Sequence, residues 1–167
     1  GTVQKGSGAM PACVKRALDS GVPILSNDYL AGLDTKEARI IFKGLNSRMP
    51  MLAARVASLR NVGVVLSELG SFSKIFSDAE YYLFNNGKGI IEKITEKFLS
   101  YKDISRFDGN DLLFYKRAQL FPMMYYGRAL DSNGKLPLIR DPENFGVITD
   151  YAVPNALRTL GILKYHR

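Results

Sequence analysis

The sequence predicts an all-α protein built as a single helical domain. Apolar residues recur at helical spacing along almost the whole chain. No stretch alternates apolar and polar residues for long enough to demand a β-sheet. A chain of 167 residues, 46% of them hydrophobic, is long and apolar enough to bury one core.

The first half of the chain predicts three helices with recognisable ends. An apolar stripe over residues 10–18 stops at Gly21, a residue typical of helix C-termini. Asp34 followed by Glu37 has the pattern of a capping box and opens a short helix that runs through Phe42. A long helix follows Pro50, and its apolar stripe consists of Leu52, Val56, Leu59, Gly63, Leu66 and Leu69.

The second half predicts further helices separated by breaks. One helix is expected from Ser71 to Phe84 and another over residues 90–98. Leu112 to Leu130 is predicted as a helix that Pro122 kinks or splits, because proline removes a backbone donor. A turn-rich connection from Asp131 to Pro142 then leads to the last helix. In that helix, the side chains expected to point inward are those of Val153, Ala156, Leu157, Leu160 and Leu163.

Two glycine-containing segments are predicted to carry no chemistry. Residues 1–8 are small and polar, which indicates a flexible lead-in or a cloning remnant ahead of the helical domain at 9–167. Asn86-Gly87-Lys88-Gly89 has neither the strand context nor the Ser or Thr of a phosphate-binding loop. We expect a turn there.

Composition restricts the ligand and the setting. The formal charge of +7 favours an anionic ligand, whether a phosphate, a nucleotide or a nucleic acid. Cys13 is the only cysteine, which suits a reducing, cytosolic setting, and we expect it in the core. One Cys and one His cannot supply a zinc site, so no metal or cofactor is expected. The apolar runs are too short for a membrane span, so no membrane partner is expected.

Asp150 is the leading candidate for a functional carboxylate. Proline is tolerated only in the first turn of a helix, so Pro154 places Asp150 at or just before a helix N-terminus. Exposed backbone N–H groups there should keep Asp150 ionised at neutral pH. The local sequence favours a simple N-cap, but a carboxylate at this place also suits glycosidic cleavage, where positive charge develops on the sugar.

A dense aromatic and basic cluster lies about thirty residues upstream. Phe114-Tyr115-Lys116-Arg117-Ala118-Gln119 is expected in one helix, where Tyr115 and Gln119 share a face, as do Phe114 and Arg117. Stacking surfaces with amide and cationic partners suit a purine-like base and a phosphate. The alternative is that Phe114 belongs to the core while Lys116 and Arg117 are solvated.

The order of these motifs resembles the queuosine salvage protein family. Gly-Val-Pro-Ile at 21–24, Met-Pro-Met-Leu-Ala-Ala-Arg at 49–55, Phe-Tyr-Lys-Arg-Ala-Gln at 114–119 and Asp-Tyr-Ala-Val-Pro at 150–154 follow in the order found in that family. The resemblance extends from Gly6 to Tyr165. It implies a helical fold similar to that of DNA glycosylases, whose catalytic aspartate lies on a helix similar to the one after Asp150.

The resemblance also implies an activity and a set of site residues. Family members hydrolyse the N-glycosidic bond of queuosine 5′-phosphate and free queuine, which is salvaged into tRNA. Asp150 is then the catalytic residue, without metal or cofactor, and the substrate is a small nucleotide. The expected substrate-binding residues are Phe114, Tyr115, Lys116, Arg117, Gln119 and Tyr151.

Departures from the family pattern keep alternatives open. Ala152 replaces an Arg and Asn155 replaces a Gln, while Met124 stands where the family commonly has an Asp. A noncatalytic nucleic-acid-binding module on a glycosylase-like fold is the second hypothesis, and a DNA glycosylase is the third. Family members extend further at both ends, so a site in a partial chain would expose Phe114, Tyr115 or Tyr151.

Overall fold

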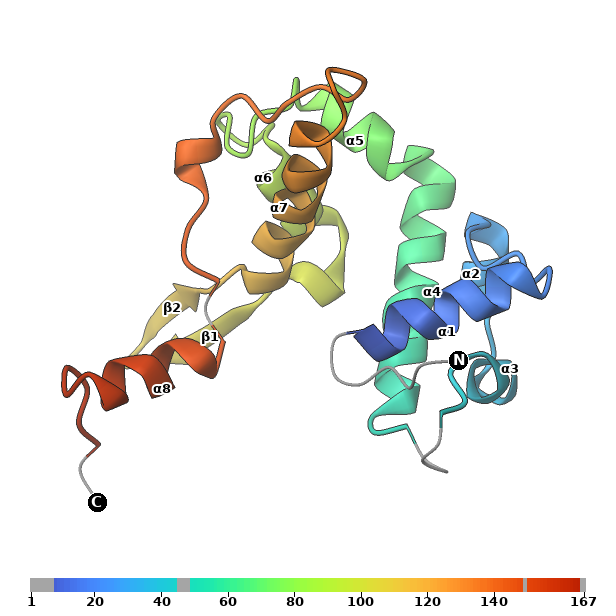
Figure 1. The fold of residues 1–167 in the computed structure, drawn as a ribbon, viewed down its shortest axis with the longest axis horizontal. Helices are drawn as coiled ribbons and strands as arrows, with labels where there is room; N and C mark the ends of the chain where they lie inside the picture. The colour runs from blue at the N-terminus through green and yellow to red at the C-terminus, as the bar shows by residue number, and fades with distance from the viewer. Residues whose placement is uncertain (1–7, 45–48, 149, 166–167) are drawn as a thin grey trace. The chain divides into compact units, whose positions relative to one another are not determined.

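The computed structural model describes residues 8–44, 49–148 and 150–165, and the chain falls into two compact units, Gly1–Ser71 and Phe72–Arg167 (Figure 1). The predicted lead-in at 1–8 lies outside the described residues, apart from Gly8. The assignment of 9–167 to one domain stays a prediction. Among the described residues, no helix is both long and apolar enough to cross a bilayer.

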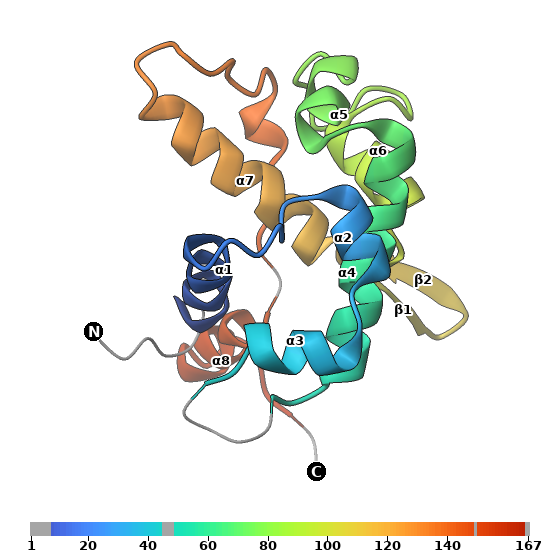
Figure 2. The ribbon, with the colours of Figure 1, turned by 90° about the vertical axis from the view of Figure 1, so that its right-hand side faces the viewer.

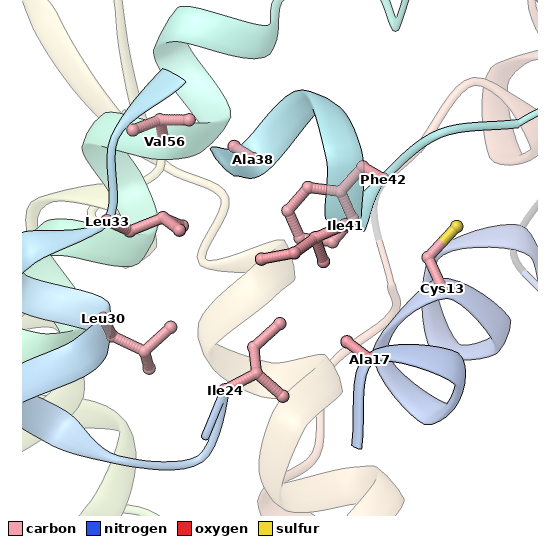
Figure 3. Close-up of a cluster of buried hydrophobic side chains, with 9 residues drawn as sticks. All are labelled: Cys13, Ala17, Ile24, Leu30, Leu33, Ala38, Ile41, Phe42 and Val56. Carbon is pink, nitrogen blue, oxygen red and sulfur yellow. The ribbon is translucent and has the colours of Figure 1, made fainter. Parts of the chain in front are cut away.

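In the first unit, the regular structure of the described residues is helical. Its elements are α1 (Ala9–Asp19), α2 (Asn27–Gly32), α3 (Thr35–Ile41) and α4 (Leu52–Leu69). Helix α2 packs along α4, as both views show (Figures 1 and 2). Figure 3 shows the core of this unit, where buried side chains from all four helices and their connections converge, Cys13 among them as expected.

Helix ends in the first unit follow the sequence signals only in part. Gly21 takes a left-handed φ of 77° just after α1, as expected of a C-terminal glycine. The Asp34 side chain caps α3 by accepting from the Glu37 N–H at 2.7 Å. The Glu37 carboxylate does not complete the box, because it accepts from the Tyr29 hydroxyl at 2.6 Å. Helix α2, which brings Tyr29 there, was missed by the sequence prediction.

The second unit combines helices with one small sheet. Its elements are α5 (Phe72–Asp78), α6 (Ile90–Lys97), η2 (Leu99–Tyr101), β1 (Ile104–Phe107), β2 (Asn110–Leu113), α7 (Lys116–Leu130), η3 (Pro142–Asn144) and α8 (Ala152–Thr159). Its core is aromatic where α5, α6 and α7 meet: the Phe72 ring lies 5.2 Å from Phe98 and 4.7 Å from Phe121 between centroids. Such pairs add about 0.5–1.5 kcal/mol each beyond their burial.

The expected helix from Ser71 to Phe84 is shorter than predicted. Helix α5 ends at Asp78, and Glu80 and Tyr81 take left-handed φ values of 50° and 61°. The backbone N–H groups of Leu83 and Phe84 donate to the buried carboxylate of Asp141 at 2.6 and 3.2 Å. A partner far away in the sequence therefore replaces the helical bonds that the apolar spacing predicted.

The prediction of an all-helical protein is wrong at one place, the β1–β2 hairpin. Its strands pair antiparallel from Ile104 opposite Leu113 to Phe107 opposite Asn110. The turn is Asp108-Gly109, both with positive φ, which is the preferred two-residue hairpin connection. Figure 2 shows the hairpin as a projecting arm, and β2 is exposed along its whole length. Because neither face is buried, the strands lack the alternation that signals a sheet.

The helix predicted from Leu112 to Leu130 begins four residues later. Leu112 and Leu113 belong to β2, and α7 begins at Lys116. Pro122 does not split the helix, which continues to Leu130. The proline deprives the Ala118 carbonyl of its usual intrahelical donor, but Pro122 is fully buried, so packing compensates for the lost bond.

The expectation that the last helix turns its apolar side chains inward is wrong for the described structure. None of the residues of α8 is buried, and the Leu160 side chain just after it is 72% exposed. Val153, Leu157 and Leu163 are half-buried. The amphipathic pattern correctly predicts the helix, but the described residues cover its apolar face only in part.

Gly63 is predicted to be essential for the packing of α2 on α4. A Cβ at this position would collide with the Ala31 amide nitrogen and the Asn27 carbonyl oxygen of α2. Gly63→Ala should lower the free energy of unfolding by about 1–3 kcal/mol, because backbone atoms must move. The control is Gly32→Ala, where no atom lies within 4 Å of the added Cβ. Urea denaturation of both variants measures the difference, and equal stabilities would contradict the prediction.

Candidate functional site

The start of α7, like that of α4, has a left-handed N-cap residue without a capping side chain. Tyr115, its N-cap residue, has a left-handed backbone with φ 47° and no capping side-chain bond. The N–H groups of Phe114 and Tyr115 both donate to the Asp103 carbonyl, at 3.0 and 3.4 Å, which holds this bend in place. A tyrosine in this conformation is strained, and such strain is concentrated at functional sites.

Two cations occupy the first turn of α7, which has no acidic residue. Lys116 and Arg117 lie where the helix dipole already carries partial positive charge, so their charges oppose the preference for acidic groups. The positive end of a helix combined with two cations is a favourable place for an anion. The electrostatic cost in the free protein therefore becomes a gain once an anion binds.

The start of α8 has the opposite and favourable arrangement. One carboxylate oxygen of Asp150, Oδ1, accepts from the Ala152 N–H at 2.8 Å. Tyr151 is the N-cap residue, and Pro154 lies in the first turn, where its missing N–H is harmless. The prediction that Asp150 lies at a helix N-terminus is confirmed.

The two helix starts meet in an ion pair. Lys116 Nζ lies 3.3 Å from the other carboxylate oxygen of Asp150, Oδ2. The two side chains are 31% and 30% exposed, so each remains within reach of a ligand. The pKa of Asp150 is lowered, first by the hydrogen bond from Ala152 and then by the bond and charge of Lys116. A carboxylate that stays ionised and accessible is therefore present at this point.

The aromatic candidates do not share a helix. Phe114 and Tyr115 precede α7, so they do not lie on helix faces with Arg117 and Gln119 as expected. The reason is the bend at Tyr115, which follows the hairpin. Phe114 is 37% exposed and Tyr151 is 80% exposed, while Tyr115 is half-buried. Two of the three rings therefore offer a large accessible apolar surface for stacking.

Gln119 makes hydrogen bonds at both ends of its amide. The Oε1 atom accepts from the Gly146 N–H at 2.7 Å, and Nε2 donates to the Phe114 carbonyl at 3.3 Å. Its predicted contact with a base stays a prediction. The bonds in the structure join two backbone segments that flank Lys116 and Asp150.

The connection between α7 and α8 contains residues that sequence reasoning missed. The expected turns are present, with left-handed φ values at Asn133 and Gly134, and Asp141 is buried. Its carboxylate fixes this segment to the backbone of Leu83 and Phe84. Asp141-Pro142 is an ordinary turn dipeptide, so no local signal in the sequence predicts that the Asp141 carboxylate is buried and binds a distant backbone segment.

The glycine-containing turn at 86–89 binds no phosphate in this arrangement. Backbone N–H groups of Asn85, Gly87 and Gly89 donate to the Glu92 carboxylate at 2.8–2.9 Å. The prediction of a turn is confirmed, and an internal carboxylate occupies its donors. Among the described residues, no group of three or more His, Cys, Asp or Glu side chains is placed to hold a metal ion.

Comparison with known proteins gives one consistent result. Residues 2–167 match the model of the queuosine salvage protein family. A relative from Sphaerobacter thermophilus named queuosine 5′-phosphate N-glycosylase/hydrolase is 36% identical over 99% of this chain and 50% of its own length. The mouse protein of that name is 32% identical over 99% of this chain and 48% of its own. The chain thus spans about half the length of the curated relatives it matches.

The carboxyl pKa of Asp150 should rise in Lys116→Met but stay below its ordinary value. The hydrogen bond and charge of Lys116 are lost, whereas the hydrogen bond from Ala152, which is the largest single cause, remains. Carbon-13 NMR titration measures the shift, with Lys15→Met as a control because Lys15 pairs with Asp19 instead. An unchanged Asp150 pKa would show that the ion pair does not form.

The lowered pKa of Asp150 also determines the direction in which the stability of the fold changes with pH. Because its folded-state pKa lies below the ordinary value, ionised Asp150 stabilises the fold at neutral pH. This contribution falls as the pH drops from about 4 through the lower folded-state value.

Proposed function

The chain belongs to the queuosine salvage protein family, and on that premise we propose that it hydrolyses the N-glycosidic bond of queuosine 5′-phosphate to release queuine. Asp150 is the catalytic residue. The observation that carries the proposal is its carboxylate, which is held at a helix start by Ala152, paired with Lys116 and still accessible.

The chemistry of the leaving group explains why such a carboxylate is useful. Queuine is a 7-deazaguanine, so it has no N7 that an acid could protonate. The glycosidic bond breaks with its electron pair going to the base, and the sugar develops oxocarbenium character. Water adds to the anomeric carbon, and its proton leaves to the base or to solvent. A fixed anion beside the sugar lowers the barrier by offsetting the developing positive charge.

The remaining site residues divide between the base and the phosphate. Phe114, Tyr115 and Tyr151 provide rings on which a flat base stacks. The 5′-phosphate binds Lys116 or Arg117 at the positive end of α7. When Lys116 turns from Asp150 to the phosphate, the full negative charge of Asp150 is left to act on the sugar.

Nucleic-acid binding is the second candidate, supported by the formal charge of +7 and by Met124 in place of an acidic residue. It stays a prediction, as do the DNA glycosylase resemblance of the fold and the cytosolic setting. The Lys116–Asp150 pair favours the hydrolase, because a module that only binds phosphates gains nothing from a carboxylate beside its cation.

Asp150→Asn should reduce turnover of queuosine 5′-phosphate by roughly a hundredfold to a thousandfold. The asparagine keeps an oxygen that can accept from the Ala152 N–H, so this hydrogen bond survives while the charge is lost. Chromatography of released queuine measures the rate. Asp78→Asn, which removes the charge of an exposed pair with Lys74, is the control and should release queuine at the wild-type rate. Equal rates in Asp150→Asn and wild type would contradict the catalytic role.

Arg117→Met should weaken use of the phosphorylated substrate selectively. Loss of a charge-assisted contact should lower kcat/KM for queuosine 5′-phosphate by about tenfold to a hundredfold. Use of unphosphorylated queuosine should change little. Arg128→Met, a cation at the other end of α7, is the matched control. Equal losses on both substrates in Arg117→Met would remove Arg117 from the phosphate site.

A further inference from the structure

Between η3 and α8, the residues that the structure describes belong to no helix or strand. The position of this segment therefore depends on side chains that reach it from elsewhere in the second unit. The Phe145 ring lies 6.0 Å from Tyr126 of α7 between centroids. One residue further on, the Gly146 N–H donates to Gln119 Oε1 at 2.7 Å. The next described side-chain contact to α7 is the pair of Asp150 with Lys116.

Gln119 lies in the first turns of α7, three residues after Lys116, and bonds to both sides of the site. Its Nε2 donates to the carbonyl of Phe114, which lies two residues before Lys116. Its Oε1 accepts from the N–H of Gly146, which lies four residues before Asp150 and 27 residues from Gln119. One side chain thus joins the backbone that leads to the cation and the backbone that leads to the carboxylate.

Gly146 is fitted to this contact by its lack of a side chain. An added Cβ would lie 2.8 Å from Gln119 Oε1 and 3.4 Å from Nε2. The first distance is shorter than a normal carbon–oxygen contact, so the amide would have to move. A side chain at 146 therefore requires the Gln119 amide to shift from its position in the structure, which disturbs its contact with the connection.

We propose that Gln119 and Gly146 form a clamp that positions the catalytic carboxylate of Asp150 relative to Lys116. This inference rests on the proposed hydrolase function, and it gives Gln119 a positioning role rather than contact with the base. The clamp acts on Asp150 through the backbone, so its loss lowers the rate of the chemical step more than the binding of substrate.

The test compares Gln119→Met, Gly146→Ala and the double variant with wild type. Each single variant should lower kcat for queuosine 5′-phosphate by roughly tenfold to a hundredfold, since small misplacements cost that much, with KM nearly unchanged. Because both changes break one contact, the double variant should lose no more than the worse single variant. Gly127→Ala in α7, where an added Cβ meets no atom within 4 Å, is the control and should match wild type.

A second readout needs no turnover. Without the clamp, Lys116 and Asp150 separate, so the carboxyl pKa of Asp150 measured by carbon-13 NMR should rise in both single variants, by no more than in Lys116→Met. If wild type releases no queuine, the proposed function fails. The pKa of Asp150 in the two single variants then tests the clamp alone, and a pKa equal to that of wild type overturns it. If wild type is active, unchanged kcat in Gly146→Ala overturns the clamp. A KM effect confined to Gln119→Met would assign Gln119 to base binding instead.

Discussion

The structure around Asp150 depends on bringing two helix starts together. Helix α7 has 15 residues and is therefore about 22 Å long, yet Lys116 at its beginning pairs with Asp150, which follows its far end by some twenty residues. In the part of the returning connection that the structure describes, the regular structure is one short 3₁₀ turn. The connection is held instead by side chains bonded to backbone groups: Tyr125 to Pro137, Asp141 to Leu83 and Phe84, and Gln119 to Gly146.

The two helix starts are electrostatic opposites, and this difference matters for the proposed chemistry. Asp150 lies where a helix stabilises a negative charge, and its lowered pKa reflects that. Lys116 and Arg117 lie where a helix disfavours positive charge, next to a strained Tyr115. An arrangement that is unfavourable in the free protein becomes favourable when an anion binds. A phosphate near α7 and a cationic sugar near Asp150 would satisfy both ends with one nucleotide.

Three carboxylates of the second unit have different roles because their surroundings differ. Glu92 accepts from three backbone N–H groups of its own turn, and buried Asp141 accepts from two in a distant one. Both are fully used as structural acceptors. Asp150 accepts from one backbone N–H, and its second oxygen pairs with a partly exposed lysine, whose side chain is flexible by nature. It is therefore the carboxylate of the three that is free to act on a ligand.

The sequence by itself determined most helices, the position of Asp150 just before a helix, and the family resemblance. These follow from local signals: apolar spacing in α1, α4 and α6, Asp34 before Glu37, and Pro154 four residues after Asp150. The Asp108-Gly109 turn was also a local signal, but exposed strands gave no alternation to support it. Only the tertiary structure decided that Asp141 ends the helical run before Leu83, that Tyr115 bends, and that Gln119 reaches Gly146. The Asp141 and Gln119 contacts join residues 58 and 27 positions apart, and the bend at Tyr115 depends on the carbonyl of Asp103. No spacing rule within one element encodes a partner on another.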